Sequence, residues 1–215
     1  MTHDRPFDHP ALGQYGRGPD GRSTQISSRL GTPDWVAASL NYCSRCGSGL
    51  AFGLVPGEDR ERLACPSCGF IAYVNPRPVV TAIPITDDGR IVLLRRGIDP
   101  GRGLWAQPGG FLEVDETVSE AAIRETYEET GLVVRPGEIV GLYSRLEAAV
   151  VVIAFEAHVV AGEFRVNPEA QEIVAFPPAE IPWGEVAFLT SKWAIRDWIC
   201  LRRPDLLPTT PQLPG

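Results

Sequence analysis

The chain has 215 residues, 44% hydrophobic and 22% charged, an ordinary globular composition that allows one domain of moderate size and a smaller module. The net charge of −7 excludes a general basic surface for nucleic acid, so we expect an anionic substrate to rely on local cations, either metal ions or arginines. No apolar run approaches the roughly 18 residues of a membrane helix, and the N-terminus lacks a signal-peptide layout. We therefore expect a soluble, cytoplasmic protein with no membrane partner.

Residues 1–40 are expected to form a flexible N-terminal arm. Residues 1–30 are rich in Gly, Pro, Asp, Arg and Ser and contain few apolar residues, which is typical of unstructured chain. The stretch Pro33–Leu40 favours one or two helical turns, with Thr32 as N-cap. At the other end of the chain, the proline-rich residues 204–215 are expected to be disordered.

Two CxxCG motifs follow the arm and indicate a metal site. Each pair of cysteines forms a knuckle, and two pairs complete a tetrahedral site of four thiolates. The glycine after each pair suits a turn with positive φ, which directs backbone N–H groups at the sulfurs. We predict a zinc ribbon over residues 41–76, structural because four thiolates leave no position for water, with iron or disulfides as alternatives. The predicted ligands are Cys43, Cys46, Cys65 and Cys68.

A β-hairpin is expected next. Its strands are Val79–Thr86 and Arg90–Arg96, joined by a tight Asp-Asp-Gly turn. Arg95 and Arg96 point to opposite faces of the second strand, so only one of them can face a substrate cleft, and Arg95 is the candidate.

An acid-rich helix is predicted from Thr117 to Thr130. This stretch has good helix formers and no interior Gly or Pro, and Gly131 stands where helices commonly stop. Glutamates at i, i+3 and i+4 share one face, where their like charges repel unless a cation lies between them. Such oxygen ligands suit Mg²⁺ or Mn²⁺; the alternative is a solvated acidic face. The three are Glu125, Glu128 and Glu129.

The rest of the second domain, which is expected to span residues 77–203, contains strands and one more long helix. Runs of Val, Ile and Phe predict the strands, and helical spacing of apolar residues predicts the last helix, in which Cys200 is expected to be buried. The expected elements are strands at Leu132–Val134, Glu138–Leu146 and Ala149–Val160, an acidic loop at Glu163–Glu172, a strand at Ile173–Phe176, a one-turn helix within Pro177–Trp183 and a helix at Leu189–Leu201.

The spacing of residues around the acidic helix resembles a family signature. This spacing is similar to the motif of the Nudix hydrolases. It runs from Gly110 through five residues to Glu116, through seven more to Arg124-Glu125, through two to Glu128-Glu129 and through one to Gly131. With the ribbon in front, GLWxxPGG before the helix and an NPEAQE loop after it, the chain resembles FAD and ADP-ribose pyrophosphatases. NADH pyrophosphatases are similar more distantly, because GLYSRLEAAVVV does not contain their SQPWPFPxS segment. The resemblance implies an α+β fold class: a Nudix α/β/α sandwich with a mixed sheet, preceded by a small zinc ribbon.

The resemblance also implies an activity. The expected reaction is divalent-metal-dependent hydrolysis of the pyrophosphate bond in a nucleoside diphosphate linked to another moiety, with ADP-ribose or FAD favoured. The alternatives are a ligand-sensing or protein-binding module, and a pyrophosphatase for NADH or NAD-capped RNA. Three intact glutamates favour an enzyme, because a pure binder needs no metal ligands. The implied partner is a nucleotide-derived small molecule, nucleic acid is disfavoured by charge, and a homodimer is an open alternative to a monomer.

Metal and proton chemistry are assigned to the helix and the acidic loop. The resemblance implies that Mg²⁺ or Mn²⁺ is held by the three helix glutamates and by the backbone carbonyl of Gly110. Glu125 and Glu172 compete as the general base, with Glu169 behind them. Arg124 is expected to hold Glu125 in place.

Substrate contacts are expected outside the helix. Arg145 or Arg95 is a candidate for stabilising charge on the transferred phosphorus. Trp105 is a candidate for stacking on a nucleobase, although the usual burial of Trp favours packing against the sheet.

Overall fold

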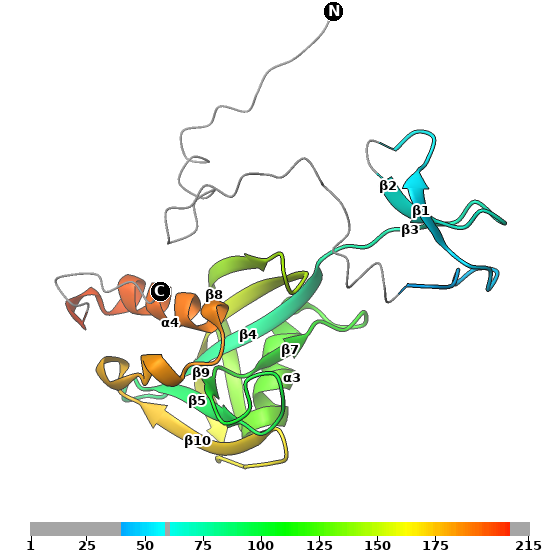
Figure 1. Ribbon diagram of the computed structural model, residues 1–215. Coiled ribbons are helices and arrows are strands. Elements are labelled where there is room, and N and C mark those ends of the chain that lie inside the picture. The colour runs from blue at the N-terminus through cyan, green and yellow to red at the C-terminus, as the bar shows by residue number, and fades with distance from the viewer. Residues whose placement is uncertain (1–39, 59–60, 207–215) are drawn as a thin grey trace, which may run out of the picture. The chain divides into compact units, whose positions relative to one another are not determined.

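The computed structural model describes residues 40–58 and 61–206, which fall into two compact units divided between Val74 and Asn75 (Figure 1). The predicted N-terminal arm, with its helical turns, lies outside the described residues except for Leu40. Most of the predicted disordered tail lies outside them too, but its first residues form a short 3-10 helix, η3 (Pro204–Leu206). Among the described helices, none is long and apolar enough to cross a membrane.

The first unit is an antiparallel sheet with two cysteine knuckles. Its strands are β1 (Ala51–Leu54), β2 (Glu61–Ala64) and β3 (Ile71–Ala72), in the order β1-β2-β3. Gly47 and Gly69 have φ angles of 74° and 71°, the positive values predicted for the CxxCG turns. The amide of each glycine donates to the carbonyl of the first cysteine of its pair, at 2.8 and 2.9 Å.

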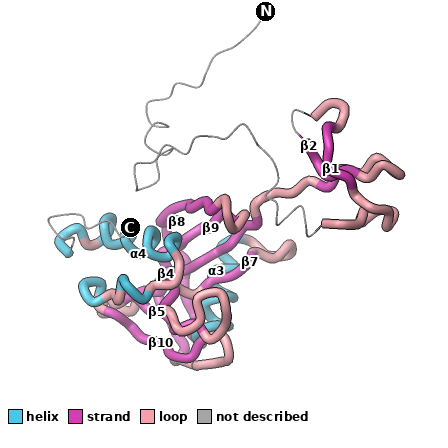
Figure 2. Tube along the Cα trace, in the orientation of Figure 1, coloured by secondary structure: helices cyan, strands magenta, loops and turns pink. Residues whose placement is uncertain are grey.

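The described residues of the second unit form a mixed sheet whose main path runs β10-β5-β4-β9-β8 (Figure 2). Only the central β4–β9 pair on this path is parallel; the other pairs are antiparallel. The strands are β4 (Arg77–Ile85), β5 (Ile91–Arg96), β8 (Leu132–Arg145), β9 (Val150–Gly162) and β10 (Ala170–Phe176).

The predicted hairpin is present but opens immediately. β4 and β5 pair at Ile85 and Ile91, and then two short strands lie between them. β6 (Trp105–Ala106) pairs with β5, and β7 (Gly109–Phe111) pairs with β4. The segment that leads into the acidic helix is therefore inserted into the middle of the sheet, which places the start of that helix beside the core strand β4.

Helices cover both faces of this sheet. Val80 and Ala82 of β4 pack with Ala121 and Ala122 of the helix α3 (Val118–Thr130). The alternate residues of β4, including Ile83, pack on the opposite face with the helix α4 (Leu189–Arg202). Each fully buried Ile or Leu in these layers contributes about 1.5–3 kcal/mol. This is the α/β/α sandwich with a mixed sheet that the sequence predicted.

Several element predictions need correction. The two strands expected between residues 132 and 146 form one strand, β8, with irregular pairing where Pro136 interrupts the ladder. The acidic loop is shorter than predicted, because β10 already begins at Ala170. The one-turn helix predicted within Pro177–Trp183 is confirmed as the 3-10 helix η1 (Pro178–Glu180), and a second 3-10 helix, η2 (Trp183–Glu185), follows it. Cys200 is exposed rather than buried, because α4 directs Ile199 and Trp198 into the core instead.

Candidate active site

The acidic helix α3 is delimited by local capping interactions. Thr117 is the N-cap: its hydroxyl accepts from the Glu120 amide at 3.3 Å, and the Glu120 carboxylate accepts from the Thr117 amide at 2.8 Å. At the other end, Gly131 adopts φ 79° and its amide donates to the Tyr127 carbonyl at 2.9 Å. The helix predicted at Thr117–Thr130 is confirmed, and its Ala121 and Ala122 are buried against the sheet.

Arg124 is the centre of the charge network on α3. Its guanidinium donates to both oxygens of Glu116 at 2.9 and 2.6 Å, to Glu125 at 2.7 Å and to Glu128 at 3.0 Å. A further bond at 3.2 Å reaches the Phe111 carbonyl at the entry to the helix. Hydrogen bonds from Arg124, with one from the Glu113 amide, lower the pKa of Glu116 to about 2. Arg124 therefore holds two helix glutamates in place, as expected for Glu125.

Two glycines of the preceding strand β7 contact the predicted metal-binding glutamates Glu125 and Glu129. A Cβ on Gly110 would lie 2.4 Å from Glu125 Oε1, so the Glu125 carboxylate occupies the space that a side chain would need. The Gly109 amide donates to Glu129 Oε2 at 2.9 Å. Gly110, proposed from the sequence as a carbonyl ligand, therefore lies in contact with one of the three predicted metal-binding glutamates.

Burial makes two of these glutamates hard to ionise. Glu129 is only 9% exposed, and desolvation raises its pKa to about 7 despite the bond from Gly109; the nearby charges of Glu125 and Glu169 raise it further. Desolvation also raises the pKa of Glu125, against the opposing effect of Arg124. Buried carboxylates this close together are a poor arrangement unless a cation joins them. An all-oxygen donor set of this charge fits Mg²⁺ or Mn²⁺.

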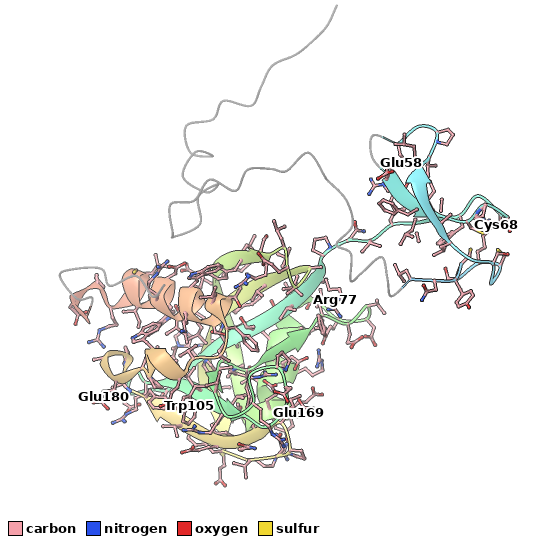
Figure 3. The ribbon with its side chains drawn as sticks, viewed as in Figure 1. Glu58, Cys68, Arg77, Trp105, Glu169 and Glu180 are labelled. Carbon is pink, nitrogen blue, oxygen red and sulfur yellow. The ribbon has the colours of Figure 1, made fainter. Side chains whose placement is uncertain are left out.

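The three helix glutamates line a cavity of about 460 Å³. Its opposite wall is the segment between β9 and β10, which contributes Arg165, Val166, Asn167, Pro168 and Glu169. The cavity is thus a pocket with four carboxylates and one arginine, open to solvent on the side of Glu169, which lies at the surface of the unit (Figure 3).

The two candidate bases from the acidic loop are separated by the structure. Glu169 lines the cavity, and its carboxylate accepts no hydrogen bond from the described residues. Glu172 instead lies on β10 opposite Arg95, and its carboxylate accepts from Arg95 Nε at 2.9 Å. The sequence-based order, with Glu172 ahead of Glu169, is therefore not supported, because the start of β10 carries Glu172 away from the cavity wall.

The candidate substrate contacts on the sheet also need correction. Trp105 is 4% exposed, packs edge-on against Phe176 at 5.0 Å between ring centroids, and lies inside the unit (Figure 3). Its ring is not available for stacking on a base, so the packing interpretation holds. Arg95 covers that ring at 4.5 Å and pairs with Glu172 and Glu185. It is a structural clamp over the core rather than a residue of the acidic cavity.

Arg96, on the opposite face of β5, does not line the cavity; its guanidinium lies 5.0 Å from the Phe188 ring, and its charge lowers the pKa of Glu129. Its Nε donates to the Pro100 carbonyl at 2.8 Å. Arg145 does not line the cavity either. It pairs with Glu147 at 3.3 Å, and its guanidinium lies 6.0 Å from the centroid of the Trp193 ring. Opposite faces of β5 were predicted correctly, but the sequence contained no information on which face would meet α3.

The four ribbon cysteines form the other candidate site. Their Sγ atoms all lie within 4.8 Å of one another, with 3.7 Å between Cys43 and Cys68 and 3.5 Å between Cys46 and Cys65. Zn–S bonds of about 2.3 Å place tetrahedral sulfurs about 3.8 Å apart, so the cluster fits a zinc ion. The Arg45 amide points at Cys43 Sγ at 3.4 Å, as the knuckle geometry predicted.

Comparison with known families agrees with both units. Residues 75–198 match the model of the NUDIX domain, and residues 41–74 match the model described as Nudix N-terminal, a zinc-ribbon module.

Individual relatives share parts of the chain. It is 37% identical over 114 residues to an ADP-ribose pyrophosphatase of Methanocaldococcus jannaschii, covering 51% of this chain and 67% of that protein. It is 31% identical over 133 residues to the NAD-capped RNA hydrolase NudC of Pseudomonas aeruginosa, covering 61% of this chain but only 45% of that one. A solved NUDIX hydrolase from Nitrosomonas europaea superposes with a TM-score of 0.72 at 32% identity, over 76% of this chain and 93% of that chain.

Proposed function

This chain belongs to the Nudix family, and from that membership we propose that it hydrolyses the pyrophosphate bond of a nucleoside diphosphate joined to a second moiety, with ADP-ribose as the favoured substrate and FAD behind it. One observation carries the proposal: a single cavity gathers four carboxylates, from Glu125, Glu128, Glu129 and Glu169. The 37% identity to an ADP-ribose pyrophosphatase supports the substrate.

The carboxylates of α3 and, as the family resemblance implies, the backbone carbonyl of Gly110 are the groups that would hold Mg²⁺ or Mn²⁺. When bound, the cation neutralises charge on the phosphate oxygens of the substrate and so makes phosphorus easier to attack. Arg124 orients two of the ligands, and the Gly109 amide orients a third.

We assign the general base to Glu169. In hydrolysis, a water oxygen bonds to one phosphorus, the water proton passes to Glu169, and the P–O bond to the other phosphate breaks. The products are a nucleotide and a phosphorylated moiety. Glu169 suits this role because it faces the helix glutamates across the cavity, and no arginine in residues 40–58 or 61–206 is paired with its carboxylate. Glu125, the competing candidate, is already bonded to Arg124 and pressed against Gly110.

A second candidate substrate is NADH or NAD-capped RNA, which the identity to the Pseudomonas NAD-capped RNA hydrolase favours. Against it stand the acidic net charge and the missing SQPWPFPxS segment.

The test is a substrate panel with purified full-length protein in 5–10 mM Mg²⁺, or about 1 mM Mn²⁺, levels well above typical dissociation constants of such sites. We expect ADP-ribose to give AMP and ribose 5-phosphate with the highest kcat/KM, ahead of FAD, NADH, NAD-capped RNA and nucleoside triphosphates. Faster turnover of NADH or NAD-capped RNA selects the second candidate. The absence of turnover of every compound refutes an enzyme of this class and leaves the ligand-sensing alternative. A Glu128→Gln variant with full activity refutes the metal site.

For the ribbon we propose one structural zinc ion on the four cysteines. A catalytic role for this zinc would need an open coordination position, which four thiolates do not leave.

A further inference from the structure

The segment between β9 and β10, Glu163–Glu169, here called the pocket loop, covers the C-terminal end of α3. A helix leaves its last four carbonyls without partners inside the helix. In α3 the Tyr127 carbonyl accepts from Gly131, as described, and the Thr130 carbonyl accepts from the Arg165 amide at 2.9 Å. The carbonyls of Glu128 and Glu129 both accept from Nδ2 of Asn167, at 3.0 and 3.2 Å. The pocket loop therefore completes the hydrogen bonding of the helix end that carries two of the predicted metal ligands.

The other half of the Asn167 side chain points back into the pocket loop. Its Oδ1 accepts from the Glu169 amide at 2.8 Å and from the Ala170 amide at 3.0 Å. A carboxamide has two donor hydrogens and one acceptor oxygen, and here both ends are used at once. Aspartate would lack the donors, and alanine would lack both. One side chain thus joins the backbone under Glu128 and Glu129 to the backbone of Glu169.

The pocket loop is also held from its far side. The Gly97 amide donates to the Glu169 carbonyl at 2.7 Å. A Cβ on Gly97 would lie 2.0 Å from the Pro168 carbonyl oxygen, so the two backbones are in direct contact. The Glu169 backbone is therefore fixed between β5 and α3, and Asn167 provides the link to α3.

The position of this backbone decides where a fourth carboxylate stands. Glu169 lines the cavity opposite the helix glutamates, and it is close enough for its charge to act on Glu129. A shift of about 1 Å in a reacting group can cost about 100-fold in rate.

We propose that Asn167 is a positioning residue: its carboxamide holds Glu169 across the cavity from Glu125, Glu128 and Glu129, at the place from which Glu169 accepts the proton of the attacking water. The kinetic part of this inference rests on the proposed function, whereas the structural part does not.

The structural part is tested by amide hydrogen exchange in the substrate-free protein. In Asn167→Ala we expect the Glu169 amide to exchange at least about fivefold faster, because it loses a hydrogen bond worth about 1 kcal/mol, which is about fivefold. The Ala170 amide should change less, because it also donates to the backbone carbonyl of residue 167 at 3.1 Å, a bond that the substitution keeps. Amides of the core strand β4 should be unchanged. Gln171→Ala, an exposed amide side chain on β10, is the matched control and should leave all of these rates as they are. Unchanged exchange at the Glu169 amide in Asn167→Ala overturns the proposal whatever the activity.

The kinetic part is tested by a double-mutant cycle with Glu169→Gln. We expect Glu169→Gln to lower kcat at least about 100-fold and Asn167→Ala at least about 10-fold, with KM little changed. In the Glu169→Gln background, Asn167→Ala should cost less than about twofold, because the group that it positions is already inactive. Asn167→Gln keeps the carboxamide on a longer side chain and serves as the conservative variant. Its loss in kcat should likewise shrink to less than about twofold in the Glu169→Gln background.

The outcomes separate the two hypotheses. Equal losses from Asn167→Ala in both backgrounds show a general structural effect and overturn the positioning role alone. Full kcat in Glu169→Gln overturns the assignment of the base, and the kinetic part of the positioning role with it. No turnover by the wild type on the whole panel refutes the proposed function, while the exchange measurement still decides whether Asn167 holds the Glu169 backbone.

Discussion

Replacing Gly110 with alanine should damage the metal site while leaving the fold nearly intact. The added methyl carbon would lie 2.4 Å from Oε1 and 2.6 Å from Cδ of Glu125. A carbon and an oxygen normally approach no closer than about 3.3 Å, so the carboxylate must withdraw by about 1 Å. Because this carboxylate is the far end of a flexible side chain, the cost to folding should be at most about 1 kcal/mol, or about 2–4 °C in Tm.

Function should be affected far more than stability. A displacement of about 1 Å in a metal ligand corresponds to a loss of about 100-fold in kcat/KM, equivalent to about 2.7 kcal/mol in the activation free energy. The assays are Mg²⁺-dependent ADP-ribose hydrolysis and, independently of any substrate, titration of Mn²⁺ followed by electron paramagnetic resonance. We expect weaker Mn²⁺ binding by at least about 10-fold.

The neighbouring glycine provides the contrasting variant. A Cβ on Gly109 would lie 2.4 Å from the Val80 carbonyl oxygen and 2.7 Å from the Thr81 Cα, both in the backbone of the core strand β4. This backbone cannot withdraw, so Gly109→Ala should lose about 3 kcal/mol of stability, or about 9 °C in Tm. If Gly110→Ala keeps wild-type Mn²⁺ affinity and kcat/KM, or is destabilised as much as Gly109→Ala, the inferred contact between Gly110 and Glu125 is refuted.

Three further predictions concern the charges and the ribbon. The pKa of Glu129 rises from its ordinary 4.5 to about 7, so in the metal-free protein its burial costs nothing below pH 4.5 and costs about 3 kcal/mol once the pH has risen through 7. Metal-free Glu129→Gln should therefore exceed the wild type in Tm by only about 2 °C at pH 5 but by about 9 °C at pH 8. Mn²⁺ should remove the larger difference for the wild type, and an equal Tm difference at both pH values would contradict the burial of a charge. Arg124→Lys should weaken Mn²⁺ binding about 10- to 100-fold, because one ammonium cannot bond Glu116, Glu125 and Glu128 together. Calorimetric titration measures this affinity, and an unchanged value would disprove the orienting role of Arg124. Elemental analysis should find one zinc per chain in the wild type and none in Cys65→Ser, whereas iron, or no metal together with paired disulfides, would reject the zinc assignment.

Local sequence patterns were sufficient to predict the acidic helix and the cysteine knuckles of the ribbon. The bounds of α3 depend on residues within a few positions of its ends, namely Thr117, Glu120 and Gly131, and the shared face of its glutamates follows from helical periodicity. The cysteine knuckles are equally local, because each pair and its glycine form one turn. These interactions do not depend on the rest of the fold, so the sequence by itself was sufficient to predict the residues of both candidate metal sites.

The residues around the helix depended on contacts between distant segments. Period-two alternation placed Arg95 and Arg96 on opposite faces, but the pairing of β6 with β5 decided that Arg95 covers Trp105. Arg96 lies over the Phe188 ring instead. Likewise, the register of β10 on β5 removed Glu172 from the cavity wall.

The tertiary structure alone selected Glu169 as the fourth carboxylate of the cavity. The sequence placed Glu169 and Glu172 in one acidic segment and could not separate them. The register of β10 on β5 places Glu172 beside Arg95, whereas Glu169 lies in the pocket loop, which Asn167 bonds to the end of α3. The physical reason is that a helix presents its side chains by its own geometry, whereas a strand or loop presents them only through the partners it pairs with.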